Sequence, residues 1–180
     1  MRSLHRKNPI QNHRDNTMTV KEIIDKLLLS FQVYYNVKRE DVEPPFIAEA
    51  EFHTHDEQFF LVKSAVLSEA ESREYVFFAT EEYLDEDTLH RLDKTAWERG
   101  MGRVKPHKDH RNTDVVLFIV AERISGEAFK EIPRLRHYQS YHLGLQGWSH
   151  YRLVAIEQSS GRTVYNRLGR SYQKLIRNII

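Results

Sequence analysis

Two carboxylates and an imidazole occupy alternate positions in the stretch Phe46-Ile-Ala-Glu-Ala-Glu-Phe-His53. In a β-strand, alternate side chains point to the same side, about 7 Å apart at the backbone, so Glu49, Glu51 and His53 would converge there. This mixture of oxygen and nitrogen ligands suits zinc, manganese or iron, and such a metal would activate water for hydrolysis. The same alternation is also typical of a half-buried antiparallel strand whose polar side faces solvent. We favour this second interpretation.

Basic residues gather between Met101 and Thr113, the longest segment that we expect to be irregular. Cations on a loop can clamp phosphate oxygens, although this stretch contains no aromatic residue on which a nucleic-acid base would stack. The alternative is a solvated loop whose charge is offset by neighbouring acidic residues. The basic residues are Arg103, Lys105, His107, Lys108, His110 and Arg111.

A third group of candidates lies near the C-terminus: His137, Tyr141, His142, Trp148, His150 and Arg152, of which Trp148 and Arg152 belong to one expected strand. If Gln146-Gly147 is a two-residue turn, Tyr141 faces Arg152 and the two can form a cation–π pair. Trp148 would then wall a small pocket beside the turn. The alternative is a cross-strand ladder that only stabilises the sheet.

Composition bounds the classes of function. The chain has 180 residues, of which 40% are hydrophobic and 29% charged, as expected for one soluble globular domain. Without cysteine it has no disulfide, thiolate zinc site or cysteine nucleophile. We find no nucleotide-binding glycine loop, no nucleophile elbow and no apolar stretch of transmembrane length. We therefore expect a cytoplasmic protein without a membrane partner.

The charge is unevenly distributed along the chain. Residues 1–17 carry four cations and one anion, a net +3, which leaves −2 for residues 18–180 out of the total of +1. We expect residues 1–17 to be a flexible basic tail, and residues 18–180 to be a single domain.

The elements that position these residues follow from hydrophobic periodicity. Val115–Ala121 is an unbroken apolar run, typical of a strand covered on both faces, and we expect it at the centre of the sheet. An apolar stripe with a capping box at Thr19 and Glu22 predicts a helix from Met18 to Asn36. Further helices are predicted over residues 85–100, 125–132 and 171–180, and further strands over residues 46–53, 58–67, 74–80, 138–145, 148–157 and 162–166.

In this interpretation residues 46–53 and 58–67 form a hairpin that pairs Phe52 with Phe60, Ala50 with Val62 and Glu49 with Lys63. Gly100 is expected to end the second helix in a left-handed conformation. The element order α-βββ-α-β-α-βββ-α predicts an α+β fold, in which a single mixed, mostly antiparallel sheet packs against helices.

The first six elements, α-β-β-β-α-β, have the order of the restriction-endonuclease-like nuclease core. Those enzymes hold magnesium with an acidic residue and an (Asp/Glu)-x-Lys motif on the next strand. Here no lysine follows an acidic residue by two positions; Lys63 follows Leu61 and Lys94 follows Leu92. Element order alone is an argument by analogy, so a metal-dependent hydrolase or nuclease with a degenerate site is the alternative function.

The C-terminal third contains a histidine-led stretch with the spacing Ser-aromatic-x-x-Gly-x-x-Gly-Trp, followed by an Arg-Leu strand and a Val-Tyr-Asn turn. These are residues His137–Trp148, Tyr151–Val154 and Thr163–Arg170. The pattern resembles an uncharacterised bacterial family, a domain of unknown function, from about Met18 to Arg170. The resemblance implies a compact fold and no particular activity.

Together these observations favour a non-enzymatic domain that binds a protein partner or an anionic ligand, without a cofactor, through the basic loop at 103–111 and the face that carries Trp148 and Arg152. Nucleic acid is one such anionic ligand. In the alternative hydrolase, Glu49, Glu51 and His53 would hold a divalent metal. The apolar stretch Leu175–Ile180 leaves self-association of the chain open as a third hypothesis.

Overall fold

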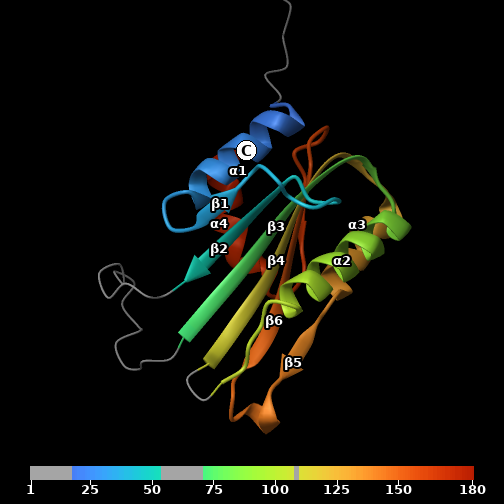
Figure 1. Ribbon diagram of the computed structural model, residues 1–180. Coiled ribbons are helices and arrows are strands. Elements are labelled where there is room, and N and C mark those ends of the chain that lie inside the picture. Colours follow the sequence, from blue (N-terminus) through green and yellow to red (C-terminus); the bar gives the residue numbers. More distant parts are fainter. Residues whose placement is uncertain (1–17, 54–70, 108–109) are drawn as a thin grey trace, which may run out of the picture.

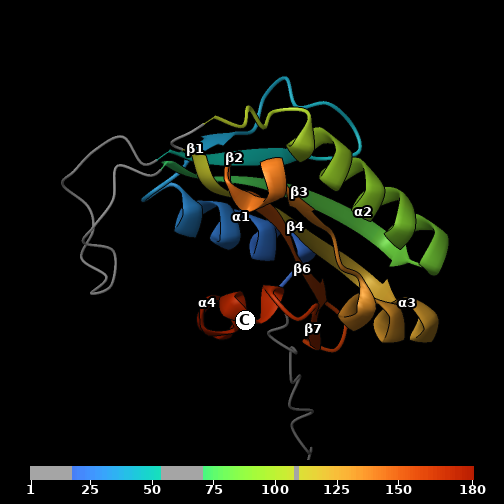
Figure 2. The ribbon, with the colours of Figure 1, turned by 90° about the horizontal axis from the view of Figure 1, so that it is seen from below.

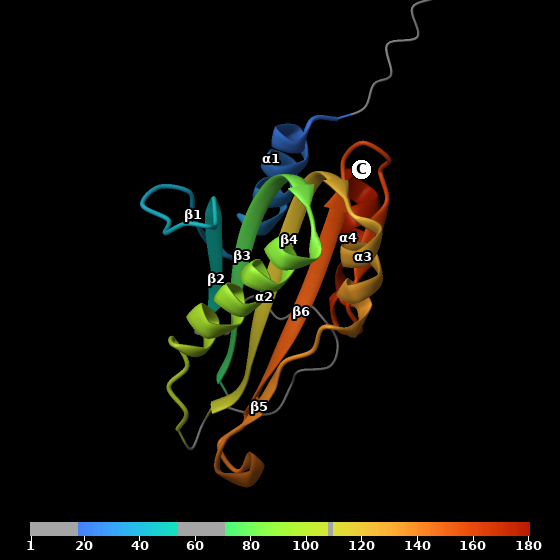
Figure 3. The same cartoon turned by 90° about the vertical axis from the view of Figure 1, so that its right-hand side faces the viewer.

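The computed structural model describes residues 18–53, 71–107 and 110–180. Within these residues a seven-stranded sheet runs in the order β1-β2-β3-β4-β6-β5, and β7 also pairs with β6 (Figure 1). Helices α2 and α3 cover one face, while α1 and α4 cover the other (Figures 2 and 3). The strands are β1 (Asn36–Lys38), β2 (Ala48–His53), β3 (Glu71–Leu84), β4 (His110–Ile124), β5 (Tyr138–Ser140), β6 (Trp148–Glu157) and β7 (Thr163–Tyr165). The helices are α1 (Val20–Phe31), α2 (Glu86–Met101), α3 (Gly126–Glu131) and α4 (Gln173–Ile179), with 3-10 turns η1 (Ile132–Arg134), η2 (His142–Gly144) and η3 (Gly169–Tyr172).

Strand β4 is the centre of the fold. It lies between β3 and β6 and is parallel to both, and residues 115–121 are 0% exposed. Its side chains alternate between two cores, one under α2 and α3 and one under α1 and α4. The remaining pairs of described strands, β1–β2, β2–β3, β5–β6 and β6–β7, are antiparallel. The predicted α+β class with a mixed, mostly antiparallel sheet is therefore confirmed.

Local capping signals place the helix starts correctly. The hydroxyl of Thr19 accepts from the Glu22 amide, and the Glu22 carboxylate accepts from the Thr19 amide, which completes the predicted capping box. Asp85 and Ser125 likewise cap α2 and α3. Helix α1 ends at Phe31, earlier than the predicted Asn36, because the chain then turns and supplies β1 to the edge of β2.

The predicted partner of β2 is wrong. Strand β2 pairs with β1 on one side and with β3 on the other, so that Ala50 lies between Val37 and Val76. Glu49 likewise has strand partners on both sides, which leaves no edge at these two positions for the expected pairing with Val62 and Lys63. The predicted strand over residues 58–67 lies outside the described residues. Alternation identifies the face of a strand and carries no information about its neighbour.

Gly100 is inside α2 and does not end it, so the predicted left-handed cap is also wrong. The helix continues to Met101, and its C-cap Gly102 has right-handed helical angles. A Cβ on Gly100 would lie 2.5 Å from Cγ2 of Val115. The missing side chain therefore lets α2 approach β4 closely.

The register of the C-terminal hairpin differs from the prediction. Tyr138 pairs with His150, and Ser140 pairs with Trp148, so residues 141–147 form the connection in place of a two-residue turn. Tyr141 therefore does not face Arg152, and its hydroxyl lies 2.9 Å from Oγ of Ser149. The predicted cation–π pair between Tyr141 and Arg152 is wrong.

Contacts with β4 hold this connection in place. Nδ1 of His110 lies 2.8 Å from the carbonyl oxygen of Gln146. Gly147 has a φ of +79°, and a Cβ there would lie 2.2 Å from the carbonyl oxygen of Arg111. Three consecutive residues in η2 also have positive φ, namely His142, Leu143 and Gly144. These conformations and long-range contacts cannot be derived from a Gln-Gly pair alone.

Candidate functional site

A row of polar and aromatic residues crosses the sheet on the face that carries α1 and α4. The row is Phe52 on β2, Glu74 on β3, Asp114 on β4, His150 on β6 and Tyr138 on β5, each in register with the next. Two residues further along these strands, toward Ala50, Val76 and Val116, the same face is apolar core. The row lies at the ends of the strands, where the core gives way to polar groups.

Arg152 and Asp114 form the centre of the site. Nη2 of Arg152 lies 2.7 Å from Oδ2 of Asp114, and Nη1 lies 2.7 Å from Oγ of Ser171. The guanidinium also lies 6.0 Å from the ring centroid of Tyr172. The Asp114 side chain is only 8% exposed and that of Arg152 26%. Burial alone would lower the pKa of Arg152, but the charge of Asp114, with contributions from Tyr172 and Glu74, raises it.

Glu74 is a second carboxyl group beside this ion pair. The hydroxyl of Tyr172 donates to its Oε1, and Tyr35 interacts with the same carboxyl. Burial raises the pKa of Glu74, and the neighbouring charge of Asp114 adds to this, although Tyr172 and Arg152 oppose it. Burial and the charge of Glu74 in turn raise the pKa values of Tyr35 and Tyr172. Two carboxyl groups thus share one guanidinium, which favours the protonated form of Glu74.

We expect the variant Glu74→Gln to change the pH dependence of stability. Because the pKa of Glu74 is higher in the folded chain than its ordinary 4.5, its stabilising contribution is present below pH 4.5 and is lost as the pH rises through the folded value. Glutamine keeps an acceptor for Tyr172 and removes this loss. Denaturant unfolding should show the stability of the variant rising relative to that of wild type as the pH increases from 4 to 7.

The exposed Glu82 on the same strand provides the control. Glu82→Gln should follow the wild-type stability curve throughout. If Glu74→Gln also follows it in parallel, the carboxyl of Glu74 does not hold its proton in the way that we infer.

An aromatic ladder, consisting of Tyr138, His150 and Trp148, extends the site along β5 and β6. The ring centroids of Tyr138 and His150 are 5.4 Å apart, and those of Trp148 and His150 are 6.3 Å apart. Tyr138 is 62% exposed, and the other two rings are partly exposed. In Figure 3, β5 and the beginning of β6 reach beyond α1 and α4. The ladder therefore offers ring faces and edges to solvent on one side of the sheet.

A C-terminal basic segment, Arg167–Arg177, contacts β6 through Ser171, whose Oγ accepts from Arg152. It contains four exposed cations and no acidic residue. None of these cations forms an ion pair with a described residue. They are Arg167, Arg170, Lys174 and Arg177.

The residues of the predicted basic loop do not form one surface. Arg103 lies on the opposite face of the sheet, 2.5 Å from Glu49 and over the ring of Phe77. His110 is buried, with its Nε2 3.0 Å from Oγ1 of Thr113 and its other ring nitrogen at the Gln146 carbonyl.

Only the end of the loop approaches the ladder. Arg111 is exposed, and its carbonyl packs against Gly147, directly before Trp148. Lys105 is exposed and His107 is partly buried. Lys108 lies outside the described residues. The structure thus places the backbone of Arg111 beside the residue before Trp148, and separates Arg103 from Trp148 and Arg152.

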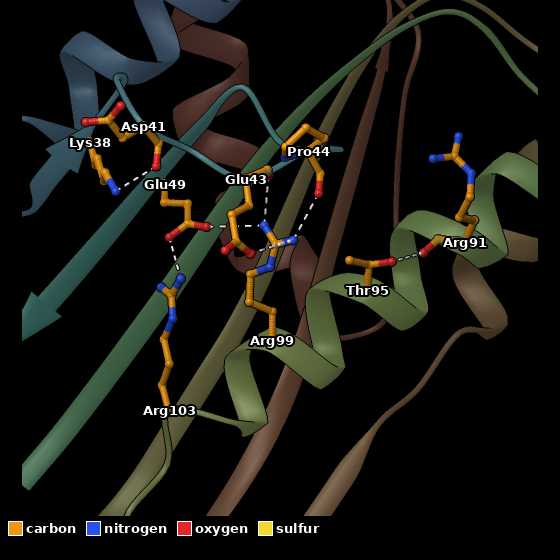
Figure 4. A network of polar contacts seen from close by, with 9 residues as sticks. All are labelled: Lys38, Asp41, Glu43, Pro44, Glu49, Arg91, Thr95, Arg99 and Arg103. Carbon is orange, nitrogen blue, oxygen red and sulfur yellow. Dashed lines mark hydrogen bonds and ion pairs between the residues drawn. The ribbon is translucent and has the colours of Figure 1, made fainter.

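The predicted metal ligands include a carboxylate that is already paired. Oε1 of Glu49 lies 3.5 Å from Arg99, and Oε2 lies 2.5 Å from Arg103 (Figure 4). Arg99 also donates to the carbonyl oxygens of Glu43 and Pro44, which fastens the β1–β2 connection to α2. Glu51 is partly buried. In residues 18–53, 71–107 and 110–180, no group of three or more histidine, aspartate or glutamate residues is arranged to hold a metal ion.

On the other face lies a histidine–aspartate pair, of which only the histidine was among the predicted candidates. Nε2 of His137 lies 2.7 Å from Oδ2 of Asp93, and its ring stacks on Trp97 at 5.1 Å. The pair joins the segment before β5 to α2.

Residues 175–180, proposed for self-association, include Ile176 and Ile179, which are buried in the core beside α1 of the same chain. Self-association stays a prediction.

Sequence reasoning identified Trp148 and Arg152 but missed Glu74 and Asp114. Each of these two carboxyl groups directly precedes the apolar run of its strand, and the two strands are parallel neighbours. The sequence signal for this pair was an acidic residue directly before each of two buried apolar runs. If the two runs form neighbouring parallel strands that begin side by side, the two acidic residues also lie side by side. Tyr35 and Tyr172 fall within two of the predicted helices, and nothing in the sequence indicates a role for their hydroxyls.

Comparison with known proteins gives one match. The model of a family described as a domain of unknown function, DUF8052, matches residues 19–178. Neither the curated proteins nor the solved structures give a match. The expected resemblance to an uncharacterised family is confirmed, and a bacterial origin stays a prediction. Among the described residues there is no helix with the length and apolarity needed to cross a bilayer.

Proposed function

We propose that this chain, which belongs to the family of the domain of unknown function DUF8052, is a non-enzymatic domain that binds single-stranded nucleic acid. In this proposal the bases stack on the aromatic ladder, and the phosphates are neutralised by Arg152 and the C-terminal basic segment. The family description names no activity, so the proposal comes from the site.

The exposed aromatic ladder beside a fixed arginine is the observation that carries the proposal. Stacking of a base on an aromatic side chain contributes about 1–3 kcal/mol and tolerates any sequence. Tyr138 and Trp148 flank His150 on a strand pair that reaches beyond the helices, so a flexible strand can lie along them. Unpaired cations supply the electrostatic attraction that such binding needs.

The alternative of a metal-dependent hydrolase gains less support. Glu49, its best ligand, has both oxygens engaged by arginines that fasten a loop. Asp114 is likewise bound by Arg152. These two carboxylates therefore orient arginine side chains, which suits binding of an anionic ligand.

Removing a ring from the ladder is expected to weaken binding. The probe is a fluorescently labelled single-stranded oligonucleotide of mixed sequence, and its anisotropy is measured against protein concentration. Trp148→Ala and Tyr138→Ala should each raise Kd by about 5- to 150-fold, corresponding to the loss of about 1–3 kcal/mol of stacking. The slope of log K against log salt should not be steeper than about −3.5, since the five cations can neutralise at most five phosphates and each contributes about −0.7.

Tyr34, in the turn that follows α1, is the matched control, because it is also 62% exposed. Tyr34→Ala should leave Kd unchanged. Dextran sulfate, a polyanion without bases, should compete weakly and should not distinguish wild type from Trp148→Ala. Equal affinity of wild type and both ladder variants for the oligonucleotide would contradict the proposal.

A further inference from the structure

We propose that Arg152, Ser171 and Lys174 form a subsite for a single phosphate group. The inference rests on the proposed function for the natural source of that phosphate, which would be the backbone of the bound strand. The subsite can nevertheless be tested with inorganic phosphate alone.

Arg152 is held so that one end of its guanidinium points away from the core. Its Nη2 lies 2.7 Å from the buried Oδ2 of Asp114, and its plane lies near the ring of Tyr172. Nη1 remains on the outer side, 2.7 Å from Oγ of the exposed Ser171. Ser171 accepts only one of the two hydrogens on Nη1. Because the buried carboxylate already fixes the arginine side chain, binding of an oxyanion to its outer N–H groups costs little additional side-chain entropy.

The hydroxyl of Ser171 is the second donor. In the structure it donates to the carbonyl oxygen of Leu168 at 2.9 Å. Because a hydroxyl hydrogen rotates freely, it can turn to a phosphate oxygen at little cost while the residue stays in place. The serine oxygen that Arg152 contacts thus occupies the side from which an anion would approach.

Lys174 is the third donor. It follows Ser171 by three residues and Arg170 by four, and residues so spaced lie on one side of a helical stretch. Lys174 and Arg170 are both exposed, and neither forms an ion pair with a described residue. Two carboxyl groups interact with Arg152 or Tyr172 among the described residues: Asp114, which Arg152 already binds, and Glu74, which accepts from the hydroxyl of Tyr172. The positive charges therefore dominate on the outer side.

The position of the subsite fits the aromatic ladder. Arg152 and Trp148 are four residues apart on β6, or about 13 Å at the rise of an extended strand. A single-stranded nucleic acid with one phosphate at Ser171 can thus continue along β6 toward His150 and Trp148. This would fix the register of the nucleic acid on a surface that otherwise accepts any base.

The first test titrates the full chain with inorganic phosphate and follows backbone amides by NMR. Amides of residues 170–174 should shift with a Kd in the millimolar range. Lys174→Gln and Ser171→Ala should each raise that Kd at least 5-fold. Lys130→Gln, which removes one exposed lysine from α3 on the other face, is the control and should leave it unchanged. Both test residues are exposed, so loss of folding is not expected; Arg152 is left intact because it supports the core.

The second test uses oligonucleotides in which one phosphate at a time is replaced by an uncharged methylphosphonate. One position should cost about tenfold in wild-type affinity, and that cost should disappear in Lys174→Gln. Equal costs at all positions, with Lys174→Gln identical to Lys130→Gln, would overturn the subsite and leave nucleic-acid binding intact. Phosphate binding at residues 170–174 without any oligonucleotide binding would support the subsite and overturn the proposed function. Absence of phosphate-induced shifts at these amides would overturn the subsite.

Discussion

Replacing Asn166 by alanine is expected to lower the free energy of unfolding by about 4 kcal/mol, because several buried groups would lose their partners at once. Asn166 is 2% exposed and connects three parts of the chain. Its Oδ1 accepts from the amides of Leu153 and Gly169, at 3.0 and 2.7 Å. Its Nδ2 donates to the carbonyl oxygens of Tyr151 and Leu135, at 3.1 and 3.2 Å. Alanine cannot replace any of these hydrogen bonds.

Denaturant unfolding measures the loss, and hydrogen exchange locates it. The amides of Leu153 and Gly169 should exchange much faster in Asn166→Ala than in wild type. Asn178→Ala, at an exposed position of α4, should change stability by less than about 0.5 kcal/mol. If the two variants are equally stable, Asn166 does not hold these segments together.

The role of Asn166 gives a structural reason for the last stretch of the family resemblance. In the Val-Tyr-Asn-x-x-Gly pattern, the asparagine bonds the amide of Gly169 three residues later. A Cβ on Gly169 would lie 2.2 Å from the carbonyl oxygen of Leu153, so only glycine allows this approach. The spacing is therefore set by the packing of the C-terminal segment on β6. A sequence pattern of this kind identifies the fold and gives no information about a ligand.

Most of the architecture follows from local signals in the sequence. The apolar run at Val115–Ala121 predicts the covered central strand, because a strand buried on both faces loses its alternation. Thr19, Asp85 and Ser125 predict helix starts, because each side chain satisfies an amide of its own first turn. The positions of the central strand and of the helix starts thus depend on residues only a few positions apart in the sequence.

The remaining features depend on contacts that are distant in sequence. A glycine at position 100 is typical of a helix end, yet here the missing side chain makes room for Val115 on a neighbouring strand. The 141–147 connection is held by His110 and by the backbone of Arg111, which no local pattern connects to it. The site behaves in the same way. Trp148 and Arg152 were predictable as residues of one strand, whereas the role of Asp114 depends on the pairing of β4 with β6.

Replacing Arg152 by glutamine is expected to lower the free energy of unfolding by about 3 kcal/mol, since it leaves a buried carboxylate without its cation. Oδ2 of Asp114 lies 2.7 Å from Nη2 of Arg152, and its other oxygen is buried without a hydrogen-bond partner among the described residues. His150, 3.9 Å from that oxygen, would be the nearest remaining cation and only when protonated. Thermal or denaturant unfolding at pH 7 to 8 measures the effect.

A double-mutant cycle separates the ion pair from the other contacts of each side chain. Asp114→Asn removes the charge that needs compensation, so the double variant with Arg152→Gln should lose about 2 kcal/mol less than the sum of the two single variants. The exposed pair of Arg134 and Glu131, 3.4 Å apart with Arg134 73% exposed, is the control. Arg134→Gln should cost less than about 0.5 kcal/mol. Additive losses at Arg152 and Asp114 would mean that the guanidinium is not fixed by this carboxylate. Its outward donors would then not be oriented in advance, and the physical basis for placing an anion beside Ser171 would be lost.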